Sequence, residues 1–264
     1  MGQKAEINGT CYDLKGGKTL IGGTAYAVKK GRTLIDGTGY DISLLSGTPI
    51  SELPVGNTVK IAVNGTLRDF LIVHQGLPSS LYDDSCNGTW LLMKDVYETR
   101  QWNSSDVNDY ANSTIHSYLN SYFIAMFDSN IQNAIKQVKI PYVNGTGGSA
   151  VASGANGLSA KIFLLSGYEV GWTTSYNEGF PVDGAKLDYF VAGWDGNSKR
   201  IAYLRDSAIY WLLRSPHNNF INYVWYVTIP GYNSTLDPSI NCGIRPVFIL
   251  PSDTLVSEDG TIIA

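Results

Sequence analysis

The sequence predicts an α+β domain preceded by a small module of repeated short strands. Three observations support this class. Apolar residues alternate on both sides of Asn64-Gly65, which is a strong hairpin signal. Residues 113–138 carry two runs of apolar residues at helical spacing, each with a capping residue before it. Residues 9–43 repeat with a period of 14 residues. We therefore expect a β-repeat module over residues 1–48 and a larger domain over residues 49–264.

Composition limits the classes of function open to the chain. Its 264 residues are enough for one large domain or two smaller ones, and 44% of them are hydrophobic. Only 16% are charged, while 28 Gly and 17 Tyr favour strands, turns and loops over long helices. The net charge of −4 gives no electrostatic case for nucleic-acid binding. We see no secretory signal at the N-terminus and no apolar run that predicts a membrane span.

The repeat begins at Gly9, Gly23 and Gly37, and each unit starts with Gly-Thr-x-Tyr. The pattern predicts short strands joined by tight turns. Two and a half such units bury little surface by themselves. We therefore expect an attachment module that oligomerises across chains, most readily as a trimer, or docks to a larger assembly. A plain β-meander appended to the main domain is the alternative.

The main domain is expected to follow a turn-rich connector at 46–56. Its predicted elements are a hairpin at 58–76, a strand at 89–96, helices at 113–127 and 130–138, and strands at 139–143 and 161–166. The apolar faces of the two helices comprise Ile115, Leu119, Tyr122, Phe123, Met126, Ile131, Ile135 and Val138. A glycine-rich loop is expected at 144–157 and an irregular segment at 171–200.

An apolar frame surrounds a polar segment between Tyr210 and Leu250. The frame consists of WLLRSP at 211–216 and GIRPVFIL at 243–250, both predicted as core strands. Residues 217–242 contain five Asn and three Tyr but no Lys, Glu, Gln or Met. A rigid frame around Asn, Tyr and Ser is typical of paratopes, where Tyr supplies contact area and Asn and Ser supply adaptable hydrogen bonds. Trp225 is predicted to anchor this segment to the core.

Residues capable of catalysis or metal binding are scattered along the sequence. The histidines and cysteines are His74, His116, His217, Cys11, Cys86 and Cys242. Their spacing predicts neither a metal site nor a disulfide framework. Asp83-Asp84 is interpreted as a solvated acidic turn, with a cation site as the alternative. Arg214 and Arg245 are expected to be structural, bonded to carbonyl groups or a carboxylate. We expect no catalytic residue, no metal and no cofactor.

Three motifs carry a resemblance to a known family. WLLRSP, Trp225-x-Val227 and the GIRPVF sequence from Gly243 resemble a domain of phage and bacterial proteins related to the C-type-lectin-fold variable proteins of diversity-generating retroelements. The resemblance covers residues 55–250 and implies a C-type-lectin-like (formylglycine-generating-enzyme-like) fold. In such proteins, Asn codons vary at their adenines and cannot become Lys, Glu, Gln, Met or Trp. Within residues 217–242, only Trp225 belongs to those five types.

This resemblance implies a diversified receptor-binding protein of a phage tail or an adhesin on the bacterial cell surface. Its partner would be a cell-surface protein or glycan of a bacterial host. The expected ligand-binding residues are His217, Asn218, Asn219, Phe220, Ile221, Asn222, Tyr223, Tyr226, Thr228, Ile229, Tyr232, Ser234, Leu236 and Ile240. One alternative is a structural tail or baseplate component. Another is an enzyme of the formylglycine-generating type, which needs two reactive cysteines, and Cys242 has no evident partner.

Overall fold

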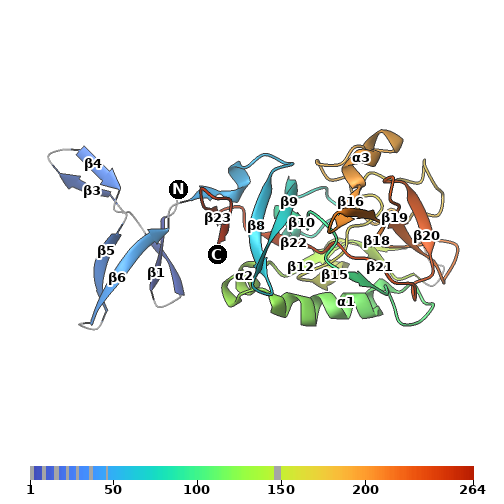
Figure 1. Ribbon diagram of the computed structural model, residues 1–264, viewed down its shortest axis with the longest axis horizontal. Helices are drawn as coiled ribbons and strands as arrows, with labels where there is room; N and C mark the ends of the chain where they lie inside the picture. Colours follow the sequence, from blue (N-terminus) through green and yellow to red (C-terminus); the bar gives the residue numbers. More distant parts are fainter. Residues whose placement is uncertain are drawn as a thin grey trace.

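The computed structural model describes residues 3–7, 10–14, 18–21, 24–27, 30–35, 38–45, 47–145 and 150–264, with the backbone alone described before residue 47. Figure 1 shows the strands of the repeat region at one end and the sheets of the main domain at the other. Within the described ranges, no helix is long and apolar enough to cross a membrane.

The repeat region forms short strands, as its sequence predicts. Those described are β1 (Gln3–Ile7), β2 (Thr10–Leu14), β3 (Lys18–Ile21), β4 (Thr24–Ala27), β5 (Lys30–Ile35) and β6 (Thr38–Leu45). They form an antiparallel sheet in the order β2-β1-β6-β5 and a separate β3–β4 pair. The turns predicted between them lie outside the described residues. Association through this module stays a prediction.

The first sheet of the main domain confirms the predicted hairpin. It consists of β8 (Thr58–Val63), β9 (Thr66–Gly76), β10 (Gly88–Met93) and β22 (Val247–Leu250). The antiparallel order is β22-β10-β9-β8. Asn64 and Gly65 connect β8 to β9 with φ angles of +49° and +70°. Two consecutive positive φ angles are what a tight two-residue hairpin turn requires, so local turn chemistry determines this connection.

The second sheet contains both frame segments of the C-terminal region. Its strands are β11 (Thr99–Arg100), β21 (Cys242–Gly243), β18 (Trp211–Pro216), β19 (Val224–Val227) and β20 (Asn233–Leu236), in that order. WLLRSP is therefore a strand, as predicted. GIRPVFIL is divided between β21 and β22, because residues 244–246 leave one sheet before the chain enters the other.

Short strand pairs complete the main domain. They are β12 (Val138–Ile140) with β15 (Leu158–Ala160), β13 (Tyr142–Val143) with β14 (Val151–Ala152), and β16 (Ala202–Leu204) with β17 (Ser207–Ile209). In the connector, β7 (Thr48–Pro49) pairs with β23 (Leu255–Val256), which pairs with β24 (Ile262–Ile263). The expected domain boundary, between residues 48 and 49, falls inside β7. Because β7 pairs with β23, it forms one sheet with the C-terminal strands.

The helical segments are short. They are α1 (Thr114–Tyr118), continued by a π turn (Leu119–Phe123) and a 3-10 turn (Ile124–Met126), α2 (Ser129–Ala134) and α3 (Asn197–Arg200). Further 3-10 turns lie at Ile50–Glu52, Asp84–Cys86, Tyr110–Asn112, Gly154–Asn156 and Trp194–Gly196. The Ser113 hydroxyl caps α1 by accepting the backbone N–H of His116 at 3.2 Å. Tyr122, predicted to face the core, is 73% exposed, and Tyr118 is buried instead.

The α+β class predicted from the sequence is wrong. Strands make up 33% of the structure and helices 18%, so the domain is β-rich. Part of the reason lies at the second predicted helix. Ile135 adopts an extended conformation and ends α2, and Val138 joins the β12–β15 ladder. The C-type-lectin-like fold that the resemblance implied was part of the same α+β prediction, and it is wrong for the same reason.

The predicted strand at 161–166 is also wrong. The segment is buried from Ile162 to Leu165, but only Phe163 makes a β-bridge. Its N–H and carbonyl pair with those of Val247 at 2.9 and 2.8 Å. An apolar run shows that a segment is buried, but only a neighbouring strand in register makes it part of a ladder.

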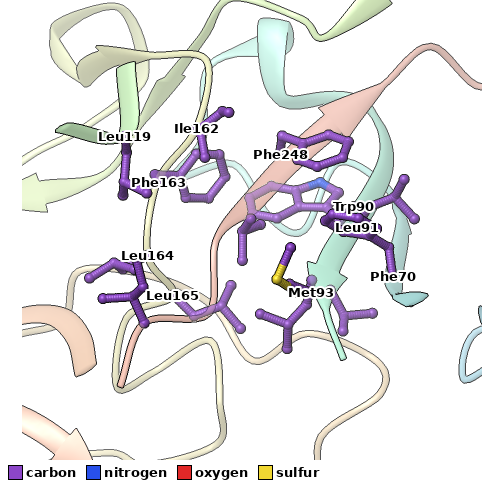
Figure 2. Close-up of a cluster of buried hydrophobic side chains, with 14 of the residues drawn as sticks. Phe70, Trp90, Leu91, Met93, Leu119, Ile162, Phe163, Leu164, Leu165 and Phe248 are labelled. Carbon is purple, nitrogen blue, oxygen red and sulfur yellow. The ribbon is translucent and has the colours of Figure 1, made fainter. Parts of the chain in front are cut away.

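Aromatic side chains fill the core beside the first sheet. Trp90 meets Phe163 edge to face with ring centroids 5.5 Å apart, and the rings of Phe70 and Phe248 lie 5.1 Å apart. Figure 2 shows these four rings together with Leu119 from the π turn. Since all five side chains are fully buried, the 161–166 segment and the helical region are held on the sheet.

Candidate binding surface

A buried ion pair holds β18, the strand that leads into the polar segment. The Arg214 guanidinium donates to both oxygens of Glu169 at 2.5 and 2.7 Å, and both side chains are completely buried. It also donates to the carbonyls of Leu164, Pro141 and Asp183. These are the partners predicted for Arg214. Removing one member of such a pair leaves an uncompensated buried charge, so β18 is strongly fixed in place.

Trp225 is buried, as the sequence predicts. Its ring stacks on Phe180 with centroids 3.9 Å apart and on His217 at 5.2 Å. The indole N–H donates to the carbonyl of Gly179 at 3.1 Å. A Cβ atom on Gly179 would lie 2.4 Å from His217 Nε2, so this close stack requires glycine. Burial lowers the pKa of His217, which favours the neutral imidazole in the stack.

Asn108 fixes the loop that precedes Trp225. Its side-chain amide donates to the carbonyls of Phe220 and Tyr223 at 2.9 Å each, and to that of His217 at 3.4 Å. Its backbone N–H donates to the carbonyl of Ile221 at 3.0 Å. Asn108 itself is completely buried. These hydrogen bonds attach the loop backbone to the buried Asn108. Nothing in the local sequence around Asn108 indicated this role.

The fourteen predicted binding residues divide by exposure. Exposed are Asn219, Phe220, Ile221, Asn222, Tyr223, Ile229, Tyr232 and Ile240. Half-buried are His217, Asn218, Tyr226, Thr228, Ser234 and Leu236. Tyr226 and Leu236 pack against the core, so only part of each side chain is available to a partner.

Five of the exposed apolar side chains form two clusters at opposite ends of the β19–β20 hairpin, and Ile240, which is 52% exposed, lies outside both. We call Phe220, Ile221 and Tyr223 the loop cluster; they are 54%, 54% and 38% exposed and precede β19. The turn cluster consists of Ile229 and Tyr232, which are 47% and 45% exposed and lie in the connection from β19 to β20. Between the clusters, the ladder pairs Tyr226 with Ser234.

Sequence reasoning missed part of the turn cluster. Trp194 is 54% exposed and meets Tyr232 edge to face at 5.4 Å. Tyr176 lies 6.4 Å from Trp194 and is 37% exposed. Both belong to the irregular segment at 171–200, whose aromatic content was the available signal. Only the tertiary structure brings these rings to the end of the hairpin.

The residues whose side chains are described contain no cluster of metal ligands, and their two cysteines are buried. Within 47–145 and 150–264, no three His, Cys, Asp or Glu side chains are placed to hold a metal ion. Cys86 and Cys242 are buried free thiols. Burial, with a smaller effect of Glu169, raises the pKa of Cys86 to about 12, and burial raises that of Cys242 as well. Thiols with raised pKa values are poor nucleophiles because little thiolate is present.

The fold and this surface define a β-rich domain with a C-terminal hairpin that presents apolar side chains on a fixed backbone. Residues 87–252 match a family model described as a domain of unknown function (DUF6273). Since the match covers well over half of the chain, the chain belongs to this family. Neither the comparison with curated proteins nor that with solved structures finds a match.

Proposed function

We propose that the chain is a non-enzymatic binding protein and that its C-terminal hairpin surface binds a protein partner. The observation that carries the proposal is the loop cluster. Phe220, Ile221 and Tyr223 remain exposed, although hydrogen bonds from Asn108 and the buried Trp225 fix the loop backbone to the core. Exposed apolar side chains gathered in one place mark interaction sites, and a rigid scaffold lowers the entropic cost of binding.

The chemistry of the surface favours a protein over a glycan. Three of its exposed side chains, Ile221, Ile229 and Ile240, offer no hydrogen bonds to sugar hydroxyls. Asp237 is the one charged side chain in residues 217–242. Depletion of charge together with enrichment in aromatic residues is characteristic of the centre of protein interfaces. In keeping with the resemblance to variable proteins, the partner would be a protein on the surface of a bacterial host, bound by a phage tail protein or an adhesin.

A matched pair of triple variants tests the proposal. The first carries Phe220→Ser, Ile221→Ser and Tyr223→Ser. The control carries Leu67→Ser, Tyr122→Ser and Val182→Ser, at side chains that are 56%, 73% and 50% exposed elsewhere. On arrays of bacterial surface proteins, the first variant should lose at least about a hundredfold in affinity, since a few interface residues carry most of the binding energy. The control should bind as the wild type does.

Three outcomes contradict the proposal. Equal losses in both variants would show that apolar exposure in general, rather than this surface, produces the signal. Binding to glycan arrays but not to proteins would identify a sugar as the partner. Absence of binding to either array, with residues 217–242 protected from labelling in an assembled particle, would favour a structural component of a tail or baseplate.

We also propose that this surface is diversified, as the resemblance implies. The variable positions would lie within residues 217–242, where Asn codons of the template are altered at their adenines and where residues such as Phe220 and Ile221 would be products of that change. Sequencing of sibling genes and of a nearby template repeat tests this directly. Differences should be confined almost entirely to adenines within codons 217–242. Differences spread evenly along the gene would refute diversification while leaving a binding surface of fixed sequence intact.

A further inference from the structure

A cavity of about 700 Å³ is lined by residues of the first sheet and of the segment that contains α3 and the β16–β17 hairpin, and none of its lining residues belongs to 217–242. Thr58 and Leu71 of β8 and β9 form one wall, and Tyr189, Lys199 and Tyr203 contribute to the other. The volume falls within the range of about 300–1,000 Å³ that is usual for sites of small ligands. Figure 1 labels α3 and β16, the elements that contribute Lys199 and Tyr203 to its lining.

Positive charge is concentrated around this cavity. Its lining includes four basic residues (Lys94, Lys199, Arg205 and Arg245) and two acidic ones (Asp95 and Asp206). Four positive charges minus two negative charges leave a formal charge of +2, whereas the whole chain carries −4. Such a local excess attracts anions, since charges around a concave surface with low-dielectric walls reinforce one another.

Arg245 is a buried guanidinium with which no carboxylate of the described residues forms an ion pair. It is 2% exposed; its Nε donates to the carbonyl of Met93 at 3.1 Å and its Nη2 to that of Lys94 at 2.7 Å. Nη1 has no hydrogen-bond partner within 47–145 and 150–264. Across the described residues, no carboxylate forms an ion pair with it, in contrast to Arg214 and Glu169. Burial lowers the pKa of Arg245 to about 10, although the charge of Asp95 acts in the opposite direction, and an additional anion would compensate the buried charge further.

Two further cations at the cavity are free to meet a ligand. In the part of the chain that the structure describes, neither Lys199 nor Arg205 forms an ion pair. The Lys199 ammonium lies 4.5 Å from the centre of the Tyr189 ring, which holds it at the rim. Arg205 has φ +57°, as residues of tight hairpin turns often do. It occupies the turn between β16 and β17.

The acidic residues oppose this attraction only in part. The Asp95 carboxylate accepts the backbone N–H of Tyr203 at 3.2 Å, and its charge is balanced in part by that of Arg245. Lys94 lies 3.7 Å from Asp69, and both side chains are about half exposed, so this pair is weak.

We propose that this cavity binds a small molecule carrying a carboxylate or phosphate group. Lys199 and Arg205 supply charge-assisted hydrogen bonds, Arg245 supplies fixed positive charge behind them, and Tyr189 supplies an aromatic wall. The site is distinct from the hairpin surface and does not depend on the function proposed for it.

Calorimetric titration of the full chain with inorganic phosphate and, separately, with citrate tests the proposal. Sodium chloride at matched ionic strength is the reference for non-specific binding. At least one of the two probes should bind saturably at one site per chain. The double variant Lys199→Gln with Arg205→Gln should weaken that binding at least about tenfold, because both substitutions remove charged donors. The double variant Lys60→Gln with Arg68→Gln removes the same two charges from exposed positions outside the cavity, and binding should be unchanged.

The outcomes show whether the site exists and which class of anion it binds. Binding of phosphate alone assigns a phosphate-bearing ligand, and binding of citrate alone assigns a carboxylate-bearing one. Absence of saturable binding by either probe overturns the proposal. So does equal weakening in the two double variants, because binding would then follow the net charge of the chain. Circular dichroism establishes that each variant is folded before titration.

Discussion

Replacing Asp183 by asparagine is expected to remove a loss of stability that the wild-type chain undergoes between about pH 4 and about pH 7. Asp183 is completely buried. Burial, with a smaller effect of Glu169, raises the pKa of its carboxyl to about 7, although Arg214 and Ser215 act in the opposite direction. The Ser215 hydroxyl donates to Asp183 Oδ2 at 2.8 Å. Arg214 bonds both oxygens of Glu169, so one guanidinium compensates two buried carboxyl groups incompletely.

The sign and size of the effect follow from linkage. The unfolded chain releases this proton near pH 3.8, whereas the folded chain retains it to about pH 7. Below the lower pKa, both states are protonated and the full stability is present. As the pH rises through the window, only the unfolded state gains by ionising, so stability falls. About 3 pKa units at about 1.4 kcal/mol each give about 4 kcal/mol, a large share of a typical stability of 5–15 kcal/mol.

Two histidines change the stability in the opposite direction as the pH rises. The stability of the variant must therefore be compared with that of the wild type at each pH. Burial lowers the pKa values of His116 and His217, which makes stability rise with pH as they titrate. Urea unfolding followed by tryptophan fluorescence, in one-unit steps from about pH 4 to about pH 8, gives both stability curves. The Asp183→Asn curve should lack the fall, and Asp84→Asn, at an exposed carboxyl, should retain it. Parallel curves for wild type and Asp183→Asn would refute the reasoning.

Three further predictions concern the hairpin and the repeat. Trp225→Ala should destabilise the domain by about 3–5 kcal/mol in thermal or urea unfolding, because it empties a stacked, fully buried site; a change below about 0.5 kcal/mol would place the indole at the surface. Asn108→Ala should cost about 1–3 kcal/mol by leaving carbonyl groups of the loop without a donor, and should weaken partner binding more than Asn112→Ala does. Light scattering should find the full chain oligomeric and a chain shortened to start at Gly47 monomeric; a monomer in both cases would exclude association through the repeat.

Much of the local structure was predictable because its causes are local. The hairpin at Asn64-Gly65 follows from the ability of these two residues to adopt positive φ. The start of α1 follows from the Ser113 cap. The helix predicted at 130–138 is wrong at its C-terminal end, because Val138 pairs in a strand with Ala160, 22 residues further along the chain. Propensity describes a segment in isolation, and pairing with a distant segment overrides it.

The candidate surface was predictable in part for the same reason. A polar segment between two apolar strands indicated an exposed region, and the one tryptophan in it indicated an anchor; both inferences need only the local sequence. The support of the loop by Asn108 and the extension of the turn cluster by Trp194 could not be inferred. Each joins residues from different parts of the chain, and such contacts depend on the final arrangement of the sheets.

The sequence by itself determined the hairpin turn at Asn64-Gly65, that residues 211–216 are buried, and that residues 219–223 are left outside the core. These properties depend on hydrophobicity and turn chemistry, which act over a few residues. Only the tertiary structure decided the β-rich class, the pairing of Arg214 with Glu169 and the absence of an ion-pairing carboxylate for Arg245 among the described residues. The two arginines look alike in the sequence. A buried charge is compensated only where folding brings a carboxylate within hydrogen-bond distance, and that depends on how distant segments pack.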